Sequence, residues 1–171
     1  LMFDDCPLVA GDIAGLAKHC HQLTVIGAGN TGISASLEGV AHYLGSTPRV
    51  LRFHSGTEFE GSISALNECT SVMTLDVHST AVAGDLSGLN SLRDLRYLDV
   101  SATDITGSLS DLGKQCLCLE EIHADHTAIS GPLSDLQPLK LLRVANFSNS
   151  KVSGRLSDLD HFVNNLRFLS I

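Results

Sequence analysis

One ten-residue pattern occurs twice in the middle of the chain, as TDITGSLSDL at residues 103–112 and as TAISGPLSDL at residues 127–136. The glycine of this pattern recurs along the whole sequence in steps of 23 to 26 residues, with alanine in its place once. A period of this length is typical of solenoid proteins, in which each repeat forms one turn of a coil and packs on its neighbours. The recurring positions are Gly11, Ala35, Gly61, Gly84, Gly107, Gly131 and Gly154.

Three further columns of residues keep the same register as the glycine. A leucine or valine follows it by five positions, a β-branched or aromatic residue precedes it by two, and a hydroxyl residue precedes it by four. The agreement of four columns establishes the repeat, so most residues are expected to serve the fold. The hydroxyl column contains Thr31, Thr57, Thr80, Thr103, Thr127 and Ser150.

Upstream of each hydroxyl lies a short segment with apolar residues at spacing two, such as Leu98-Asp-Val100. This spacing predicts a strand with one buried face. One such strand per repeat, always in the same direction, predicts a parallel sheet. The Leu-Ser-Asp-Leu segments at 109–112 and 133–136 predict short helical turns, with serines such as Ser110 placed to cap their free amides.

Residues 95–109, with leucines in the strand followed by an apolar residue and Gly-x-Leu, resemble a leucine-rich repeat. The Gly-x-Leu portion is most similar to the plant-type subfamily. The resemblance implies an α/β solenoid with parallel strands on its concave face and short turns or 3-10 segments on its convex face. Threonine stands where the family carries an asparagine ladder, and we expect its hydroxyl to bond between adjacent turns.

The repeat pattern covers essentially all of residues 1–171, which predicts a single leucine-rich repeat domain of about seven full repeats plus a partial one. Neither end carries the polar cap that a solenoid needs for solubility. We therefore expect this domain to be a segment of a longer chain, or to have its ends covered by other chains.

The chain has a net charge of −8 and a sequence pI near 5.3. An acidic balance argues against nucleic-acid binding, which needs clustered lysine and arginine. No apolar stretch approaches the length of a transmembrane helix, about 20 residues. The chain has five cysteines, an odd number. Cys20, Cys69 and Cys116 share one repeat column, which predicts that they are buried in the core. Free core thiols favour an intracellular or organellar compartment.

A glycine cluster at Gly27-Ala-Gly29-Asn-Thr-Gly32 matches the dinucleotide-binding fingerprint. However, residues 23–40 align without gaps on residues 95–112, so the same segment also fits the repeat. The acidic residue expected about 20 positions later is absent. Dinucleotide binding at Gly27–Gly32 is therefore kept as a minor alternative.

Polar residues fill the strand positions that are expected to face the concave surface. Adjacent strands lie about 4.8 Å apart, so these residues should form one acidic and histidine-bearing patch. Three interpretations are open: a solvated polar surface, a surface that recognises a partner, or a His/Asp metal site. The metal site is disfavoured because neighbouring parallel strands do not by themselves make ligands converge. The candidate residues are Thr74, Asp76, His78, Tyr97, Asp99, Ser101, Glu121, His123, Asp125, His126, Asn146 and Ser148.

The sequence contains no defensible pair of nucleophile and base, because its histidines and serines fall in repeat columns. We therefore expect no enzyme activity, no catalytic or metal residues and no cofactor. The preferred function is a protein–protein interaction or scaffold module, with protein partners and possible membership of a larger complex. Alternatives are a structural subunit whose ends and convex side are covered by other chains, and an extracellular receptor ectodomain.

Overall fold

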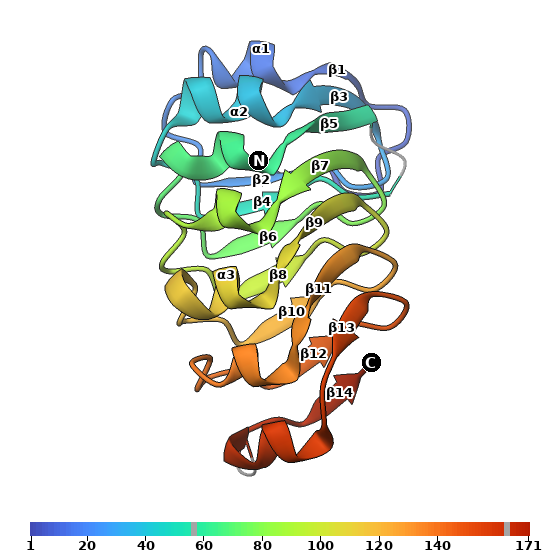
Figure 1. The fold of residues 1–171 in the computed structure, drawn as a ribbon. Coiled ribbons are helices and arrows are strands. Elements are labelled where there is room, and N and C mark those ends of the chain that lie inside the picture. The colour runs from blue at the N-terminus through green and yellow to red at the C-terminus, as the bar shows by residue number, and fades with distance from the viewer. Residues whose placement is uncertain (56–57, 163–164) are drawn as a thin grey trace.

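The computed structural model describes residues 1–55, 58–162 and 165–171 and shows a solenoid whose turns stack from one end of the molecule to the other (Figure 1). Its strands form two parallel sheets, each with seven strands. The leucine-rich repeat solenoid predicted from the sequence is therefore confirmed. Thr57 of the hydroxyl column lies outside the described residues.

The first sheet, sheet A, contains the strands predicted from the alternating apolar pattern. Neighbouring strands pair in parallel and in the register of the repeat, so that Leu75, Leu98 and Ile122 are aligned across three turns. The strands of sheet A are β2 (Val25–Gly27), β4 (Val50–Arg52), β6 (Thr74–Asp76), β8 (Tyr97–Asp99), β10 (Glu121–His123), β12 (Val144–Asn146) and β14 (Phe168–Ser170).

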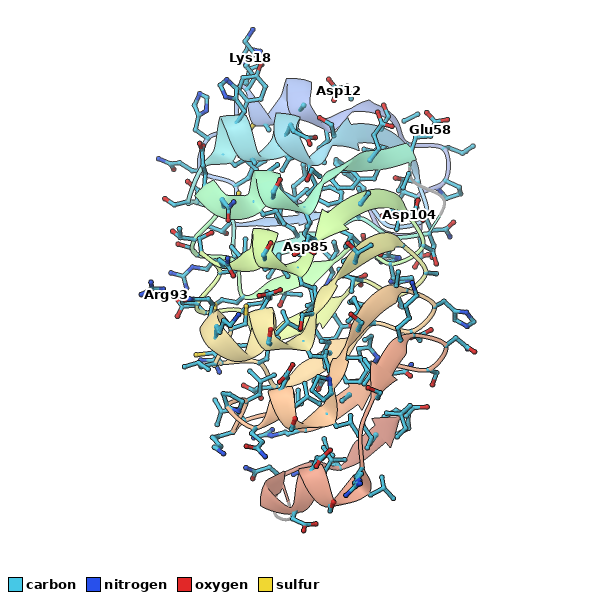
Figure 2. All side chains as sticks on the ribbon, in the orientation of Figure 1. Asp12, Lys18, Glu58, Asp85, Arg93 and Asp104 are labelled. Carbon is cyan, nitrogen blue, oxygen red and sulfur yellow. The ribbon has the colours of Figure 1, made fainter. Side chains whose placement is uncertain are left out.

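A second strand in each repeat, which the sequence analysis did not predict, forms sheet B. Each of its longer strands buries one β-branched or aromatic side chain, as β9 does with Ile105, so the alternation is too short to stand out in the sequence. Acidic side chains such as Glu58, Asp85 and Asp104 are exposed on this sheet (Figure 2). The strands of sheet B are β1 (Ala10–Asp12), β3 (Gly32–Ser36), β5 (Glu58–Ser62), β7 (Ala81–Asp85), β9 (Asp104–Ser108), β11 (Ala128–Pro132) and β13 (Lys151–Ser153).

Short helices close each turn after sheet B, as predicted from the Leu-Ser-Asp-Leu segments. The predicted cap at Ser110 is wrong, because the cap of α3 is Ser108, whose side chain accepts a hydrogen bond from the Ser110 amide. Within the described residues, none of the helices is long and apolar enough to span a bilayer. The α-helices are α1 (Ile13–Ala17), α2 (Leu37–Leu44) and α3 (Leu109–Gln115), and the 3-10 helices are η1 (Ile63–Glu68), η2 (Leu86–Leu89), η3 (Leu133–Leu136) and η4 (Leu156–Phe162).

One continuous apolar core runs between the two sheets and the helices. It consists of the leucine, isoleucine and valine columns, and most of its members are completely buried. Each turn of the coil thus supplies one layer of a shared core, and each layer depends on its two neighbours for burial.

The threonine column stabilises the bend between the two sheets. The Thr103 hydroxyl donates to the Val100 carbonyl at 2.6 Å, and the Thr127 hydroxyl donates to the Ala124 carbonyl at 2.7 Å. Among the described residues of the column, the residue before each threonine has a positive φ, as at Ala102 and His126, and this left-handed residue turns the chain. The expected hydroxyl ladder between adjacent turns is therefore wrong: the hydroxyls of Thr31, Thr80, Thr103 and Thr127 each donate to a carbonyl in the bend of their own repeat.

Candidate functional site

The outward side chains of sheet A form the polar surface that the sequence analysis singled out. Successive side chains of a strand point to opposite faces, so the residues flanking the buried Leu75, Leu98 and Ile122 point away from the core. This surface, which we call the sheet A face, consists of Thr74, Asp76, His78, Tyr97, Asp99, Ser101, Glu121, His123, Asp125, Asn146 and Ser148, together with Arg52 and His54.

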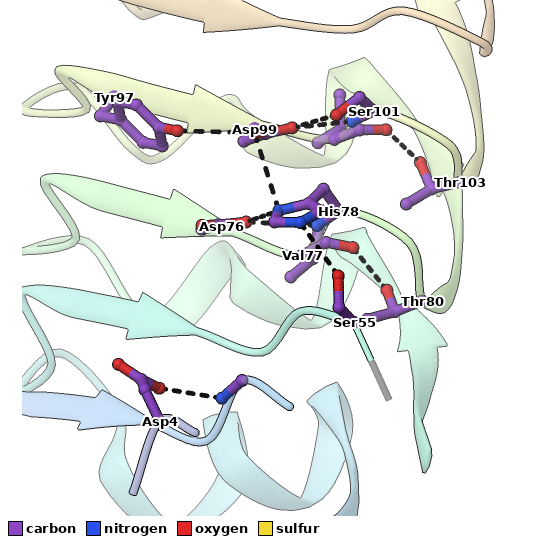
Figure 3. A network of polar contacts seen from close by, with 12 residues as sticks. Asp4, Ser55, Asp76, Val77, His78, Thr80, Tyr97, Asp99, Ser101 and Thr103 are labelled. Carbon is purple, nitrogen blue, oxygen red and sulfur yellow. Dashed lines mark hydrogen bonds and ion pairs between the residues drawn. The ribbon is translucent and has the colours of Figure 1, made fainter. Parts of the chain in front are cut away.

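Two aspartates occupy aligned positions on neighbouring strands at the centre of this surface. Asp76 on β6 and Asp99 on β8 are register partners, and they are only 8% and 9% exposed. The Nδ1 atom of His78 lies 2.7 Å from Oδ1 of Asp76 and 3.7 Å from Oδ2 of Asp99, so one imidazole contacts both carboxylates (Figure 3). This part of the face is a partly enclosed cluster rather than a fully solvated surface.

Neighbouring side chains fix the orientation of the cluster. The Ser101 amide donates to Oδ1 of Asp99 at 3.0 Å, and the Tyr97 hydroxyl donates to Oδ2 of the same carboxylate at 3.4 Å. On the other side, the Ser55 hydroxyl lies 3.2 Å from Nε2 of His78 (Figure 3). The His54 ring stacks on the His78 ring with their centroids 4.7 Å apart.

The electrostatic environment of the cluster is negative. The pKa of the Tyr97 phenol is raised well above its ordinary value, first by burial and then by the charges of Asp99, Asp76 and Glu121. The part of this rise that follows burial comes from the three neighbouring carboxylates, which disfavour a further negative charge on Tyr97. The site therefore favours positively charged groups.

Some of the other candidate residues form a second group farther along the solenoid, whereas Thr74 lies on β6 and Glu121 on β10 is the register partner of Tyr97. Asn146 donates from Nδ2 to Oδ1 of Asp125 at 2.8 Å and accepts a hydrogen bond from the Ser148 hydroxyl. His126 lies at the exposed bend and contacts the Asn149 amide at 3.2 Å. His123 connects the two groups only loosely, with its ring centroid 5.8 Å from that of Tyr97.

Three residues of the third repeat belong to the site and were missed by the sequence analysis. Arg52 on β4 is the register partner of Asp76, and His54 and Ser55 contact His78. The alignment of Val50-Leu-Arg52 with Thr74-Leu-Asp76 carried the necessary signal.

The glycine cluster at residues 27–32 does not form the strand–turn–helix unit of a dinucleotide site. Gly32 begins strand β3, and helix α2 begins only at Leu37. A Cβ atom on Gly29 would lie 2.2 Å from the His54 ring, and the Gly29 amide already donates to the Asp4 carboxylate. These glycines are required by close packing in the first repeats, not by a phosphate group.

Among the comparisons with known proteins, the comparison with solved structures finds similar proteins. No family model matches the chain, and no curated protein sequence matches it. The ectodomain of the receptor kinase SOBIR1 from Arabidopsis thaliana is 25% identical, with a TM-score of 0.58 over 71% of this chain and 66% of that chain. A plant ice-binding protein is 19% identical, with a TM-score of 0.79 over 100% of this chain and 56% of that chain.

The plant peptide hormone receptor RGFR1, solved in complex with RGF2, is 16% identical with a TM-score of 0.76. The match covers 99% of this chain and 32% of that chain, so the chain spans about a third of this receptor structure. Together with the two sheets, these similarities define the chain as a leucine-rich repeat protein in its fold.

The expected intracellular or organellar compartment is wrong. The similar structures include plant receptor ectodomains, which are extracellular. The premise about the cysteines also holds only in part. Cys69 and Cys116 are buried, but Cys20 and Cys118 are half-buried and Cys6 is exposed, and all five are free.

The cysteines should differ sharply in reactivity. Burial raises the pKa of Cys69 to about 11 and that of Cys116 to about 12, whereas Cys6 is exposed. Because the thiolate is the nucleophile, we expect iodoacetamide at pH 8 to modify Cys6 roughly 100-fold faster than either buried thiol. Mass spectrometry of peptides after timed labelling measures this. Labelling in denaturant is the control, and equal rates in the folded protein would contradict the burial of these thiols.

Proposed function

We propose that this chain is a non-enzymatic protein-interaction module that binds a protein or peptide partner through the sheet A face. The observation that carries the proposal is the pair of aligned, nearly buried aspartates at the centre of that face. Two carboxylates this close repel one another unless a cation lies between them, so the surface is built to receive positive charge. The RGFR1 structure, a peptide hormone receptor in complex with RGF2, supports this kind of use for the fold.

Two apolar residues of sheet A beyond the sheet A face indicate where the partner makes a second contact. Val144 and Phe168 occupy the same column as Tyr97, two and three strands farther along sheet A, and Phe168 is 51% exposed. At about 4.8 Å per strand, the strands of these apolar residues lie roughly 10–14 Å from strand β8, which carries Asp99. An extended peptide covers that distance in three or four residues, at about 3.3 Å per residue. The partner should therefore carry a lysine or arginine and an apolar residue at that separation.

The edges of this face also carry charge. Glu120 lies 3.0 Å from Arg96 and 3.6 Å from Arg143, which connects three neighbouring repeats along one side of the sheet. These pairs are largely exposed, so they contribute little to stability. They instead surround the acidic centre with a border that restricts where a basic partner can bind. An extracellular setting suits the proposal, because the similar structures include receptor ectodomains.

A random peptide library selected against the folded chain tests the proposal. We expect enrichment of peptides that pair a basic with an apolar residue three or four positions apart. The combined change Asp76→Ala, Asp99→Ala and Asp125→Ala should weaken their binding at least tenfold, since it removes the charges that attract them, about 1.4 kcal/mol or more. Fluorescence anisotropy of labelled peptides gives the dissociation constants.

The matched control changes the same number of acidic groups on the other sheet. Glu58→Ala, Glu60→Ala and Asp104→Ala remove three exposed carboxylates from sheet B, so the net charge shifts equally in both variants. This control should bind the selected peptides as the unmodified chain does. No enrichment of basic peptides, or equal weakening in both triple variants, would refute the proposal.

A further inference from the structure

The charges of the central cluster do not balance. Asp76 and Asp99 place two carboxylates next to one another, and their side chains are only 11% and 13% exposed. Among the described residues, His78 is the one cationic partner within ion-pair distance, and it is charged only when protonated. Arg52 is the register partner of Asp76, yet its side chain is exposed and makes no ion pair in the described part of the chain. Two carboxylates held side by side in this way are stabilised by a cation that binds between them.

Asp76 also lacks partners outside the cluster. Its Oδ1 accepts hydrogen bonds only from His78, through the backbone amide at 3.3 Å and through Nδ1 at 2.7 Å. Its Oδ2 accepts none from the described residues. The Asp76 side chain is only 11% exposed, and polar atoms with so little access to water normally have hydrogen-bond partners. The unpartnered Oδ2 is therefore available to bind a ligand.

Three metal-ligating side chains converge at this point. Asp76, His78 and Asp99 each offer one ligand atom, and these atoms all lie within 4.8 Å of one another. Asp76 and His78 are two residues apart on one strand and its extension, so their side chains point to the same side, while Asp99 approaches from the neighbouring strand (Figure 3). This convergence was not expected from parallel strands alone. It arises because the His78 ring folds back over Asp76.

We propose that Asp76, His78 and Asp99 form a binding site for a divalent transition-metal ion, with Zn²⁺ as the ion that best fits the ligands. One imidazole and two carboxylates suit Zn²⁺, whereas Mg²⁺ and Ca²⁺ prefer oxygen ligands alone. Tetrahedral Zn²⁺ places its ligand atoms about 3.4 Å apart. Nδ1 of His78 lies 2.7 Å and 3.7 Å from the two carboxylate oxygens, so small side-chain rotations reach that geometry.

Hydrogen bonds from neighbouring residues orient the ligand side chains, as such bonds do in known metal sites. The Ser55 hydroxyl contacts Nε2 of His78, which directs Nδ1 toward the carboxylates. The Ser101 amide and hydroxyl both donate to Oδ1 of Asp99. Oδ2 accepts one hydrogen bond, from the Tyr97 hydroxyl at 3.4 Å, so a second lone pair remains for the ion. The His78 side chain is 30% exposed, so a fourth coordination position remains open to water or to a partner group. This inference does not rest on the proposed partner surface, because the ion binds the isolated chain.

Titration of the purified chain with Zn²⁺ in a calorimeter tests the site. We expect one saturable site, and a Zn²⁺ affinity at least tenfold weaker after His78→Gln or Asp99→Asn. Zn²⁺ should also raise the melting temperature of the unmodified chain and leave that of His78→Gln unchanged. Circular dichroism in the absence of metal verifies that both variants fold. Asp99→Asn keeps the acceptor for Ser101 and relieves charge repulsion, so it remains informative if His78→Gln is unstable.

Two control variants lie outside the cluster, at Asp125 on the same face and at His126 in the neighbouring bend. Asp125→Asn and His126→Asn should retain full Zn²⁺ binding, and asparagine tolerates the positive φ of residue 126. Replacement of Zn²⁺ by Co²⁺ should give a visible spectrum without a thiolate charge-transfer band. The proposal is overturned if Zn²⁺ does not bind saturably, if both cluster variants bind it unchanged, or if the Co²⁺ spectrum reports cysteine ligation.

Discussion

Replacement of Gly107 by alanine is expected to destabilise the fold by about 3 kcal/mol or more, a large fraction of the stability of a typical domain. Gly107 has a φ of 118°, a conformation that residues with a side chain rarely adopt. A Cβ atom there would also lie 2.7 Å from the backbone nitrogen of Leu86 in the preceding repeat. Gly107 therefore serves two purposes: it supplies a positive φ within strand β9, and it lets consecutive turns approach closely.

A substitution at Gly84 distinguishes the cost of the backbone conformation from the cost of the close contact with the preceding repeat. Its φ of 117° is almost the same, but the nearest atoms to a Cβ there belong to the side chains of Ile63 and Ser62 at 3.2 Å. Gly84→Ala should therefore cost mainly the backbone strain, about 1–3 kcal/mol, and less than Gly107→Ala. Urea unfolding followed by circular dichroism measures both. Equal losses would show that the contact with Leu86 adds nothing, and losses below about 0.5 kcal/mol in both would contradict the strained conformation.

The same glycine column explains why the fold could be predicted so fully from the sequence. A residue such as Gly107 repeats because every turn needs the same backbone conformation at the same place, and the buried leucines repeat because each must contact the turn before and after. The aligned pair of Asp76 and Asp99 followed from this register alone, and the structure confirms it. Periodicity thus predicts which residues are neighbours on adjacent turns.

Periodicity predicts much less about how a side chain is oriented within one turn. The position of His78 over Asp76 depends on side-chain torsion angles and on the contact with His54, and no repeat column encodes either. The threonine hydroxyls had two possible acceptors, one in their own turn and one in the next, and the sequence alone could not decide between them. The imbalance of charge among Asp76, Asp99 and His78 likewise could not be predicted from the sequence, because it depends on the burial of Asp76.

Sheet B was missed for a related reason. A strand such as β9 buries only Ile105, and its remaining residues are half-buried or exposed, so its pattern is indistinguishable from a bend. The pairing of Ala83 with Asp104 and of Gly84 with Ile105 is imposed by the stacking of the turns. Because β-propensity depends strongly on the surroundings, such strands are found from the stacking and not from their own residues.

Replacement of Leu98 by alanine is expected to cost about 3–4 kcal/mol in free energy of unfolding, within the range for a fully buried leucine. Leu98 is 0% exposed on the central strand β8, and its register partners are Leu75 and Ile122. The cavity would interrupt the core between two turns, and the rigid stacking on both sides limits its collapse. Leu141→Ala is the matched control, because that leucine is 48% exposed and should cost less than about 1 kcal/mol.

The size of this loss tests whether the turns depend on one another. In a solenoid, stability is approximately a sum of repeat terms and interface terms, so a defect at Leu98 weakens two interfaces together. We therefore expect hydrogen exchange to accelerate in β6 and β10 as well as in β8, and to change little in β2 or β14. Acceleration confined to β8 would mean that each turn is stable by itself, which contradicts the shared core on which the position of the sheet A face depends.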